Sequence, residues 1–265
     1  MGCCPMRVFA TSDLHVDFPD NLAWVQQLSM ADHTDDVLLV AGDVSDALAR
    51  VGQCIAALSR RFRRVLFVPG NHELWVVRQG AAGDSLAKFD QVLAVARDSG
   101  ATTGRLQLPG LCIAPLWSWY DYSFGPLNEM LKTQWSDFHA CRWPGGLQAP
   151  ALARHFLARN DLAAAPGGCR VVTVSHFLPR ADLMPARLPP SVRDLLPVLG
   201  SAALDGQVRQ LGACLHVYGH SHLNRQVLRD GVMYVNAALG YPREGLISAR
   251  RLLHIDPLLP GPSGG

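Results

Sequence analysis

The chain carries few charges and has no excess of one sign. Lysine and arginine number 24 against 22 aspartate and glutamate residues, the formal net charge is +2, and charged residues make up 17% of the 265. A nearly neutral chain has no long-range field that gathers nucleic acid or an anionic membrane surface. We therefore expect no stable nucleic-acid binding, and any partner has to be recognised at a local site.

Paired cysteines, long apolar runs and an export signal are also missing. The seven cysteines are scattered, with no Cys-x-x-Cys pair for zinc or redox chemistry. No apolar run reaches the roughly 18 residues that span a bilayer, and the first residues lack the blocks of a secretory signal. The start MGCCPM resembles a doubly acylated terminus, but Met6 stands where myristoylation expects serine or threonine. These absences predict a cytoplasmic protein that does not enter membranes.

Hydrophobic residues make up 49% of the chain and recur in short runs. Such runs are typical of buried strands. They occupy residues 6–11, 37–41, 65–68, 111–117, 170–175, 214–219, 232–236 and 251–255. Between several of them, apolar residues follow helical three-and-four spacing, in 48–62, 86–96 and 204–211. This alternation predicts an α/β fold in which helices cover parallel strands.

We expect a single domain over residues 1–256, followed by a disordered tail at 257–265. Residues 117–143 interrupt the alternation with eight aromatic side chains and predict an insertion that acts as a lid. Packing is the favoured role for these rings, with stacking on a nucleobase or aryl group as the alternative. A second irregular segment, 177–197, contains five prolines, which block regular hydrogen bonding.

Polar residues gather directly after five of the expected strands. The motifs are SDLH (12–15), GDVSD (42–46), GNHE (70–73), SHF (175–177) and GHSH (219–222). Open α/β sheets place ligand sites at the carboxyl ends of their strands because the loops converge there. Two imidazoles two residues apart on an extended segment, His220 and His222, would point the same way and repel when protonated. A shared cation, or a pair of cations, removes this repulsion.

The motifs together offer seven metal donors. Taken alone, the aspartates, Asn71 and His176 are better explained by turns, helix caps or hydrogen bonds, whereas His15, His220 and His222 are harder to explain in this way. The donors are Asp13, His15, Asp43, Asn71, His176, His220 and His222. Seven are too many for one tetrahedral ion, whereas two ions with one shared carboxylate fit. Imidazole, carboxylate and amide ligands without a thiolate favour divalent manganese, iron or zinc.

In their order, and across residues 12–222, the five motifs resemble those of the calcineurin-like metallophosphoesterases. The resemblance implies two mixed β-sheets packed face to face with helices outside. It also implies two metal positions, the first held by Asp13, His15 and His222, the second by Asn71, His176 and His220, with Asp43 bridging them. By the same resemblance, His72 is a general acid oriented by Asp46. The implied reaction is phosphoester hydrolysis, in which a bridging hydroxide attacks phosphorus in line.

Departures from the family pattern leave the substrate open. Ala47 and Leu48 follow Asp46, where the protein serine/threonine phosphatases have an Arg-Gly pair that holds phosphate. Arg180 and Arg243 are the candidates to replace that contact. The substrate is then a phosphorylated small molecule, a nucleotide or a phosphoprotein. The alternatives are a phosphodiesterase or dinucleotide hydrolase that grips bases with the aromatic insertion, and a non-catalytic scaffold on the same fold. The sequence does not indicate an oligomeric state.

Overall fold

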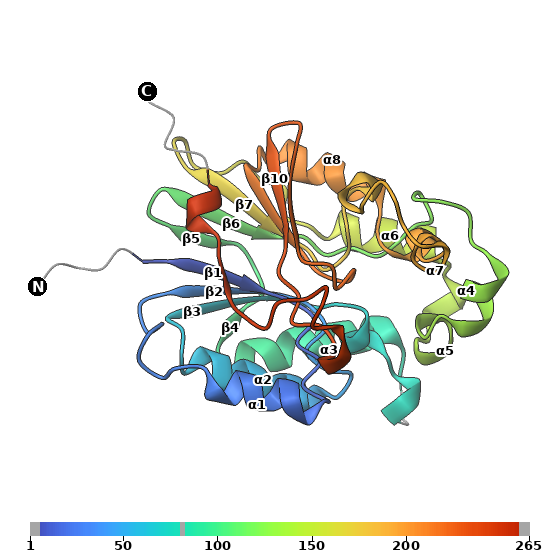
Figure 1. The fold of residues 1–265 in the computed structure, drawn as a ribbon, viewed down its shortest axis with the longest axis horizontal. Coiled ribbons are helices and arrows are strands. Elements are labelled where there is room, and N and C mark those ends of the chain that lie inside the picture. The colour runs from blue at the N-terminus through green and yellow to red at the C-terminus, as the bar shows by residue number, and fades with distance from the viewer. Residues whose placement is uncertain (1–5, 80–82, 260–265) are drawn as a thin grey trace, which may run out of the picture.

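The computed structural model describes residues 6–79 and 83–259, and within them two β-sheets lie one above the other (Figure 1). The first sheet has the order β11-β1-β2-β3-β4 and the second the order β5-β6-β7-β8-β10-β9. The strands of the first sheet are β1 (Val8–Thr11), β2 (Val37–Ala41), β3 (Arg64–Val68), β4 (Ala101–Thr102) and β11 (Leu253–His254). The strands of the second are β5 (Leu106–Leu108), β6 (Leu111–Pro115), β7 (Arg170–Val174), β8 (Leu215–Tyr218), β9 (Arg225–Arg229) and β10 (Val232–Asn236).

Both sheets are mixed, as the family resemblance implied. Strands β1 to β4 run parallel, and β11 pairs antiparallel with β1. In the second sheet β6, β7, β8 and β10 run parallel, whereas the edge strands β5 and β9 are antiparallel to their neighbours. The sequence pattern missed β4, β5 and β9 because these strands are short or half-exposed and carry no continuous apolar run.

The central strands are apolar on both faces because each face meets a different layer. Alternate side chains form one buried cluster between the two sheets: Val8 and Ala10 of β1, Val37 and Leu39 of β2, Ile113 of β6, Val172 and Val174 of β7, and Leu215 and Val217 of β8. The side chains between them, such as Leu38 and Val40 of β2, pack outward against helices. The sheets are therefore packed face to face.

Helices cover the outer face of each sheet (Figure 1). Those against the first sheet are α1 (Pro19–Gln27), α2 (Leu48–Ser59) and α3 (Ser85–Asp98). Helix α8 (Ala202–Gln210) packs on the second sheet, and α6 (Ala149–Ala158) joins α3 in a further cluster. The apolar spacing predicted α2, α3 and α8, although α2 ends at Ser59, before Phe62. It did not single out α1 or α6.

The two irregular segments contain short helices. The aromatic insertion holds α4 (Glu129–Gln134) and α5 (Asp137–Ala140), and the proline-rich segment holds α7 (Pro190–Arg193). Trp119 and Tyr120 are each only 1% exposed, which agrees with the packing role favoured for these rings. The 3-10 turns are η1 (His72–Leu74), η2 (Val77–Gln79), η3 (Pro144–Gly146), η4 (Ala181–Leu183), η5 (Leu196–Val198), η6 (Pro242–Glu244) and η7 (Asp256–Leu258).

The ordered chain continues beyond the predicted boundary at residue 257. Leu258 ends η7, and Leu259 is 8% exposed and packs into the cluster between the sheets. The Asp256 carboxylate accepts the backbone N–H of Val8 at 2.6 Å, which ties this turn to β1. The expectation of disorder was therefore wrong for 257–259, because apolar residues there complete the core. Residues 260–265 lie outside the described part of the chain.

The expectations about cysteines and membrane spans can be compared with the structure only over the described residues. Cys54, Cys112, Cys141, Cys169 and Cys214 are free cysteines. No helix in residues 6–79 and 83–259 is both long and apolar enough to cross a bilayer. Cys3 and Cys4, with most of the MGCCPM start, lie outside the described residues.

A buried histidine in β8 should make folding sensitive to pH. His216 is fully buried between the Thr173 and Ser175 hydroxyls, at 2.8 Å and 3.0 Å, and burial lowers its pKa to about 3. Below pH 6.5 the unfolded chain binds a proton at this imidazole that the folded chain does not bind. The contribution of neutral His216 to the free energy of unfolding is therefore fully present above pH 6.5. It falls by about 1.4 kcal/mol per pH unit as the pH drops from 6.5 toward 3.

Replacing His216 with Gln isolates this contribution, because every other titrating group is shared with the wild type. We expect the wild type to be the more stable protein at pH 7. Its advantage should shrink as the pH falls from 6.5 to 5, measured by urea unfolding in the presence of a chelator. A difference that stays constant over this range would contradict the assignment.

Candidate metal centre

Five strand ends deliver the seven predicted donors to one place. The loops after β1, β2, β3, β7 and β8 bring together two groups of side chains whose nitrogen and oxygen atoms lie within 4.8 Å of one another. The first group is Asp13, His15, Asp43 and His222, and the second is Asp43, His176 and His220. The Asn71 Oδ1 atom lies 3.0 Å from His176 Nε2 and so joins the second group. Asp43 is shared by both groups.

The backbone at these loops is unusual. Five of the seven donors have positive φ angles between 41° and 66°: Asp13, His15, Asp43, His220 and His222. This region is uncommon outside glycine, and residues held there cluster at functional sites. The expectation that His220 and His222 lie on an extended segment and point the same way was wrong. His222 turns toward Asp13 and His15, whereas His220 turns toward His176.

Two motif glycines allow the loops to approach so closely. A Cβ atom at Gly70 would lie 2.2 Å from Asp43 Oδ1, and one at Gly42 would lie 2.4 Å from His176 Nδ1. Gly42 also has a φ of 82°, which other residues rarely adopt. A side chain at either position would therefore displace a donor.

In the second group, His176 Nε2, His220 Nδ1 and Asn71 Oδ1 face one another as acceptors, with no hydrogen-bond donor between them. His176 Nδ1 lies 2.9 Å from the Ala41 carbonyl and His220 Nε2 lies 3.0 Å from the Val198 carbonyl. A carbonyl only accepts, so each of these nitrogens carries the proton, and burial lowers the pKa of both histidines. The remaining His176 Nε2 and His220 Nδ1 atoms then face each other, 3.1 Å apart, as lone pairs. A divalent cation between them fits this arrangement.

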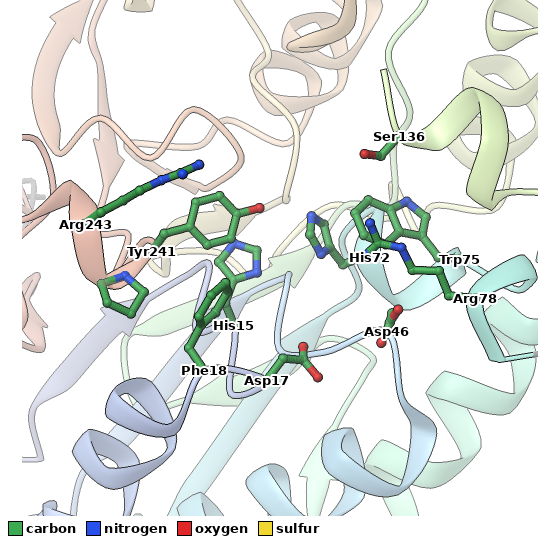
Figure 2. Close-up of a pocket in the computed structure, with 11 residues that line it drawn as sticks. His15, Asp17, Phe18, Asp46, His72, Trp75, Arg78, Ser136, Tyr241 and Arg243 are labelled. Carbon is green, nitrogen blue, oxygen red and sulfur yellow. The ribbon is translucent and has the colours of Figure 1, made fainter. Parts of the chain in front are cut away.

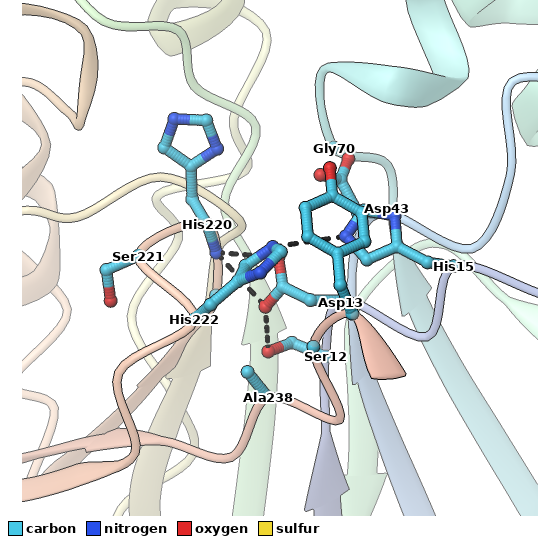
Figure 3. Close-up of polar contacts among 12 residues, drawn as sticks. Ser12, Asp13, His15, Asp43, Gly70, His220, Ser221, His222 and Ala238 are labelled. Atoms are coloured by element: carbon cyan, nitrogen blue, oxygen red, sulfur yellow. Dashed lines mark hydrogen bonds and ion pairs between the residues drawn. The ribbon is translucent and has the colours of Figure 1, made fainter. Parts of the chain in front are cut away.

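Charged and polar side chains hold the first group, whose members Asp13, His15, Asp43 and His222 lie close together in Figure 3. His222 Nδ1 lies 2.6 Å from the Glu244 carboxylate, and its Nε2 lies 3.3 Å from Asp13 Oδ1. Burial lowers the pKa of His222, but Asp13 and Glu244 outweigh it and raise the pKa to about 10. Burial favours protonated Asp13, yet His222 holds the Asp13 pKa well below its usual range. A cation at this position would take over the role of the His222 proton.

Asp43 is crowded by other carboxylates. Burial, Glu73 and Asp13 raise the pKa of Asp43 well above its usual value. Positive charge beside Asp43 would favour its ionised form. The sequence pattern gave Glu73 no function. Its carboxylate is fully buried and accepts four backbone N–H groups, from Gly70, Asp43, Val44 and Ser45 at 2.6–3.0 Å. The only sequence feature that could have pointed to this role of Glu73 is its position at the end of the GNHE motif.

His72 stands at the edge of the two groups. Its Nε2 lies 3.7 Å from Asp43 Oδ2, and its ring centroid lies 3.7 Å from that of Trp75. Burial and the neighbouring imidazoles lower the His72 pKa well below its usual value. Asp46 lines the same cavity as His72, and buried Lys88 donates a 2.6 Å hydrogen bond to the Asp46 carbonyl. The role of Asp46 in orienting His72 stays a prediction.

A cavity of about 610 Å³ opens beside His15 and His72 (Figure 2). Two similar stacks flank it. On one side the Arg78 guanidinium lies 4.7 Å from the Trp75 ring, which stacks on His72. On the other side the Arg243 guanidinium lies 5.9 Å from the Tyr241 ring, which stacks on His15 at 4.4 Å. On each side, an aromatic ring thus lies between the guanidinium and an imidazole of the centre.

The two arginines predicted to contact phosphate have different positions. Arg243 lines the cavity, as does Arg78, which the sequence pattern did not single out. Arg180 does not line it. Its guanidinium is bonded to the carboxylates of Asp182, Asp205 and Asp230 at 2.9–3.3 Å, which also raises its pKa. Arg180 is therefore part of an ion-pair network rather than a cavity residue, and the prediction for it is corrected.

Comparison with known proteins gives a family and relatives with similar sequences and structures. A family model described as calcineurin-like phosphoesterase matches residues 6–224. The [acyl-carrier-protein] phosphodiesterase PptH of Mycobacterium tuberculosis is 28% identical over 268 residues, covering 89% of this chain and 78% of PptH. The crystal structure of phosphopantetheinyl hydrolase PptH from the same organism superposes with a TM-score of 0.75 at 26% identity, covering 95% of this chain and 96% of that one.

Proposed function

The chain belongs to the calcineurin-like phosphoesterase family and is a metal-dependent phosphoesterase; from this premise we propose that it cleaves phosphodiesters at a dinuclear centre. The observation that carries the proposal is the convergence of two donor groups that share Asp43. In this arrangement Asp13, His15 and His222 would hold one cation, and Asn71, His176 and His220 would hold the other. Manganese, iron and zinc all suit these ligands.

The chain's own residues prepare the reaction around this centre. When bound at these residues, two divalent cations would supply an activated water and charge neutralisation for the phosphoryl oxygens. Glu244, Ala41 and Val198 fix which nitrogens of His222, His176 and His220 face the cations. His72, held against Trp75, would donate a proton to the departing oxygen once the negative charge of a bound phosphate offsets the burial that lowers its pKa, and Asp46 would orient it.

The cavity offers hydrogen-bond donors on both sides of the imidazoles. Its two guanidiniums, Arg78 and Arg243, can donate to polar groups on the two ester arms of a phosphodiester. No described carboxylate forms an ion pair with either guanidinium, in contrast to Arg180. The likeness to PptH, whose names specify an acyl-carrier-protein phosphodiesterase and a phosphopantetheinyl hydrolase, supports a phosphopantetheinyl-protein diester as the physiological substrate class.

The rival functions receive less support. A base-gripping role for the aromatic insertion conflicts with the burial of Trp119 and Tyr120 in the core. A scaffold without activity would need neither the seven convergent donors nor His72. We therefore retain phosphodiester hydrolysis as the proposal.

The proposal is tested with the purified protein and manganese. We expect release of phosphopantetheine from a phosphopantetheinyl carrier protein, and faster turnover of bis-aryl phosphate than of aryl monophosphate. Preference for the monophosphate, with the carrier protein untouched, would contradict it.

Replacing Arg78 or Arg243 with Ala tests the two arms. A charge-assisted hydrogen bond contributes about 1.5–3 kcal/mol, so we expect KM for the carrier-protein substrate to rise roughly tenfold or more. Because each contact would hold the substrate equally before and during reaction, kcat should change little. Arg154→Ala, at an exposed position of α6 away from the cavity, is the matched control. Unchanged KM in both cavity variants would remove the arginines from substrate binding.

A further inference from the structure

The aromatic insertion places one carboxylate directly behind the metal centre. Asp137 is the first residue of α5 and is 2% exposed. Its Oδ1 accepts hydrogen bonds from Asn71 Nδ2 at 2.8 Å and from the Trp75 indole at 2.7 Å. Its Oδ2 accepts a hydrogen bond from the Trp135 indole at 2.8 Å. Neither the motifs nor the resemblance pointed to this residue.

Each of these donors leads to a different part of the centre. The Asn71 amide presents its oxygen to His176, 3.0 Å away. The Trp75 ring lies against His72, and the Trp135 ring meets His220 edge-on with centroids 5.9 Å apart. The buried Asp137 carboxylate thus bonds directly to the proposed metal donor Asn71. Through the two indoles, it also supports the surroundings of His72 and His220.

The orientation of the Asn71 amide depends on Asp137. The oxygen and nitrogen ends of an amide have nearly the same shape, so polar neighbours decide which end faces the cation position. Without a cation, the unprotonated His176 Nε2 would accept a hydrogen bond from the amide nitrogen and favour the flipped state. The Asp137 carboxylate opposes this flip because it accepts only from the nitrogen end.

We propose that Asp137 is a positioning residue that fixes the Asn71 oxygen toward the second cation and the Trp75 ring against His72. This inference rests on the proposed dinuclear function. It gives the insertion a role in metal binding and in proton donation, in addition to covering the site. The second-site affinity and the leaving-group response are therefore coupled through one carboxylate.

Asp137→Leu tests the proposal because leucine has a similar branched shape and no acceptor oxygen. Asparagine would be a poor test, since its amide oxygen could still accept from Asn71 and Trp75 at the Oδ1 position. We expect Mn²⁺ affinity to fall about 10–100-fold at one site and to stay within about threefold at the other, measured by calorimetric titration. After dialysis, bound manganese should fall from two ions to one per chain. Excess Mn²⁺ should restore turnover of activated aryl diesters. Wild-type affinity at both sites in the folded variant would overturn the proposal.

Two further variants separate positioning from general stability. Trp135→Phe removes one hydrogen bond to Asp137 but leaves those of Asn71 and Trp75, so both manganese affinities should stay at wild-type values. Trp75→Phe removes the indole N–H that fixes the ring beside His72. It should slow diesters with poor leaving groups more than activated ones at unchanged metal affinity. Equal slowing of both substrates would overturn the second half of the proposal, even if Asp137→Leu fails to fold.

Failure of the proposed function gives a different result. In that case the wild type would bind two manganese ions without cleaving diesters, and the Asp137→Leu effect on one site would persist. Loss of the site-specific effect in an active enzyme would instead count against Asp137 alone.

Discussion

Asp43→Asn should lower diester turnover by about a thousandfold while the protein stays folded. Asp43 is the one side chain common to both donor groups, and the amide offers a single neutral oxygen where two cations require a shared carboxylate. Charge stabilisation by the metals contributes several kcal/mol, and every ~1.4 kcal/mol changes the rate tenfold. Turnover with saturating manganese, measured beside the circular dichroism spectrum, gives the comparison.

The stability of the metal-free variant provides a second check. Burial and the Glu73 and Asp13 carboxylates raise the pKa of Asp43, so a neutral amide relieves repulsion in the metal-free protein. The thermal midpoint of chelator-treated Asp43→Asn should therefore equal or exceed that of the wild type at pH 7. Asp90→Asn makes the same chemical change at an exposed ion pair with Arg159 and should leave activity within about twofold. Normal activity in Asp43→Asn would contradict the shared-carboxylate mechanism.

His72→Ala should separate substrates by their leaving groups. A proton donor is needed where the departing oxygen is a poor leaving group, and its loss costs about a hundredfold or more. Nitrophenolate departs from a nitrophenyl diester without needing a proton, so the turnover of these diesters should fall far less. The slope of log kcat against leaving-group pKa, measured over a series of aryl and alkyl diesters, should steepen in the variant.

The matched control for this substitution is His139→Ala, at an exposed position of α5. It should leave the slope unchanged. A parallel loss for all leaving groups in His72→Ala would indicate a binding or metal role and remove the proton-donor assignment.

The sequence predicted which polar side chains converge because the pattern that marks them is local. Each donor follows a buried strand within a few residues, and carboxylates, amides and imidazoles at several strand ends are rarely explained together by turns alone. The alternation of apolar runs and helical spacing likewise predicted the central strands and α2, α3 and α8. Edge strands β5 and β9 escaped because half-exposed strands lack that apolar signal.

The residues that support the donors were not predictable in the same way. Asp137 reaches Asn71 across 66 positions of sequence, and Glu244 reaches His222 across 22. Nothing in the local pattern distinguishes these carboxylates from solvated ones, because their role depends on tertiary contacts. The same reason explains Arg180, whose partners Asp205 and Asp230 lie 25 and 50 positions away.

The backbone conformation of the GHSH motif could not be predicted from the local sequence either. Because GHSH directly follows an apolar strand, the sequence predicts an extended backbone that directs both imidazoles to one side. Positive φ angles at His220 and His222 instead direct them to different donor groups. Interactions with Asp13, Glu244 and the Val198 carbonyl hold this conformation, and these partners come from other loops.

The central claim is tested most directly by anomalous diffraction from crystals of the wild type grown with excess manganese. The account predicts two peaks about 3.5–4 Å apart, one among Asp13, His15 and His222 and one among Asn71, His176 and His220, with Asp43 between them. A single peak, or manganese bound elsewhere while these side chains remain without it, would contradict the account.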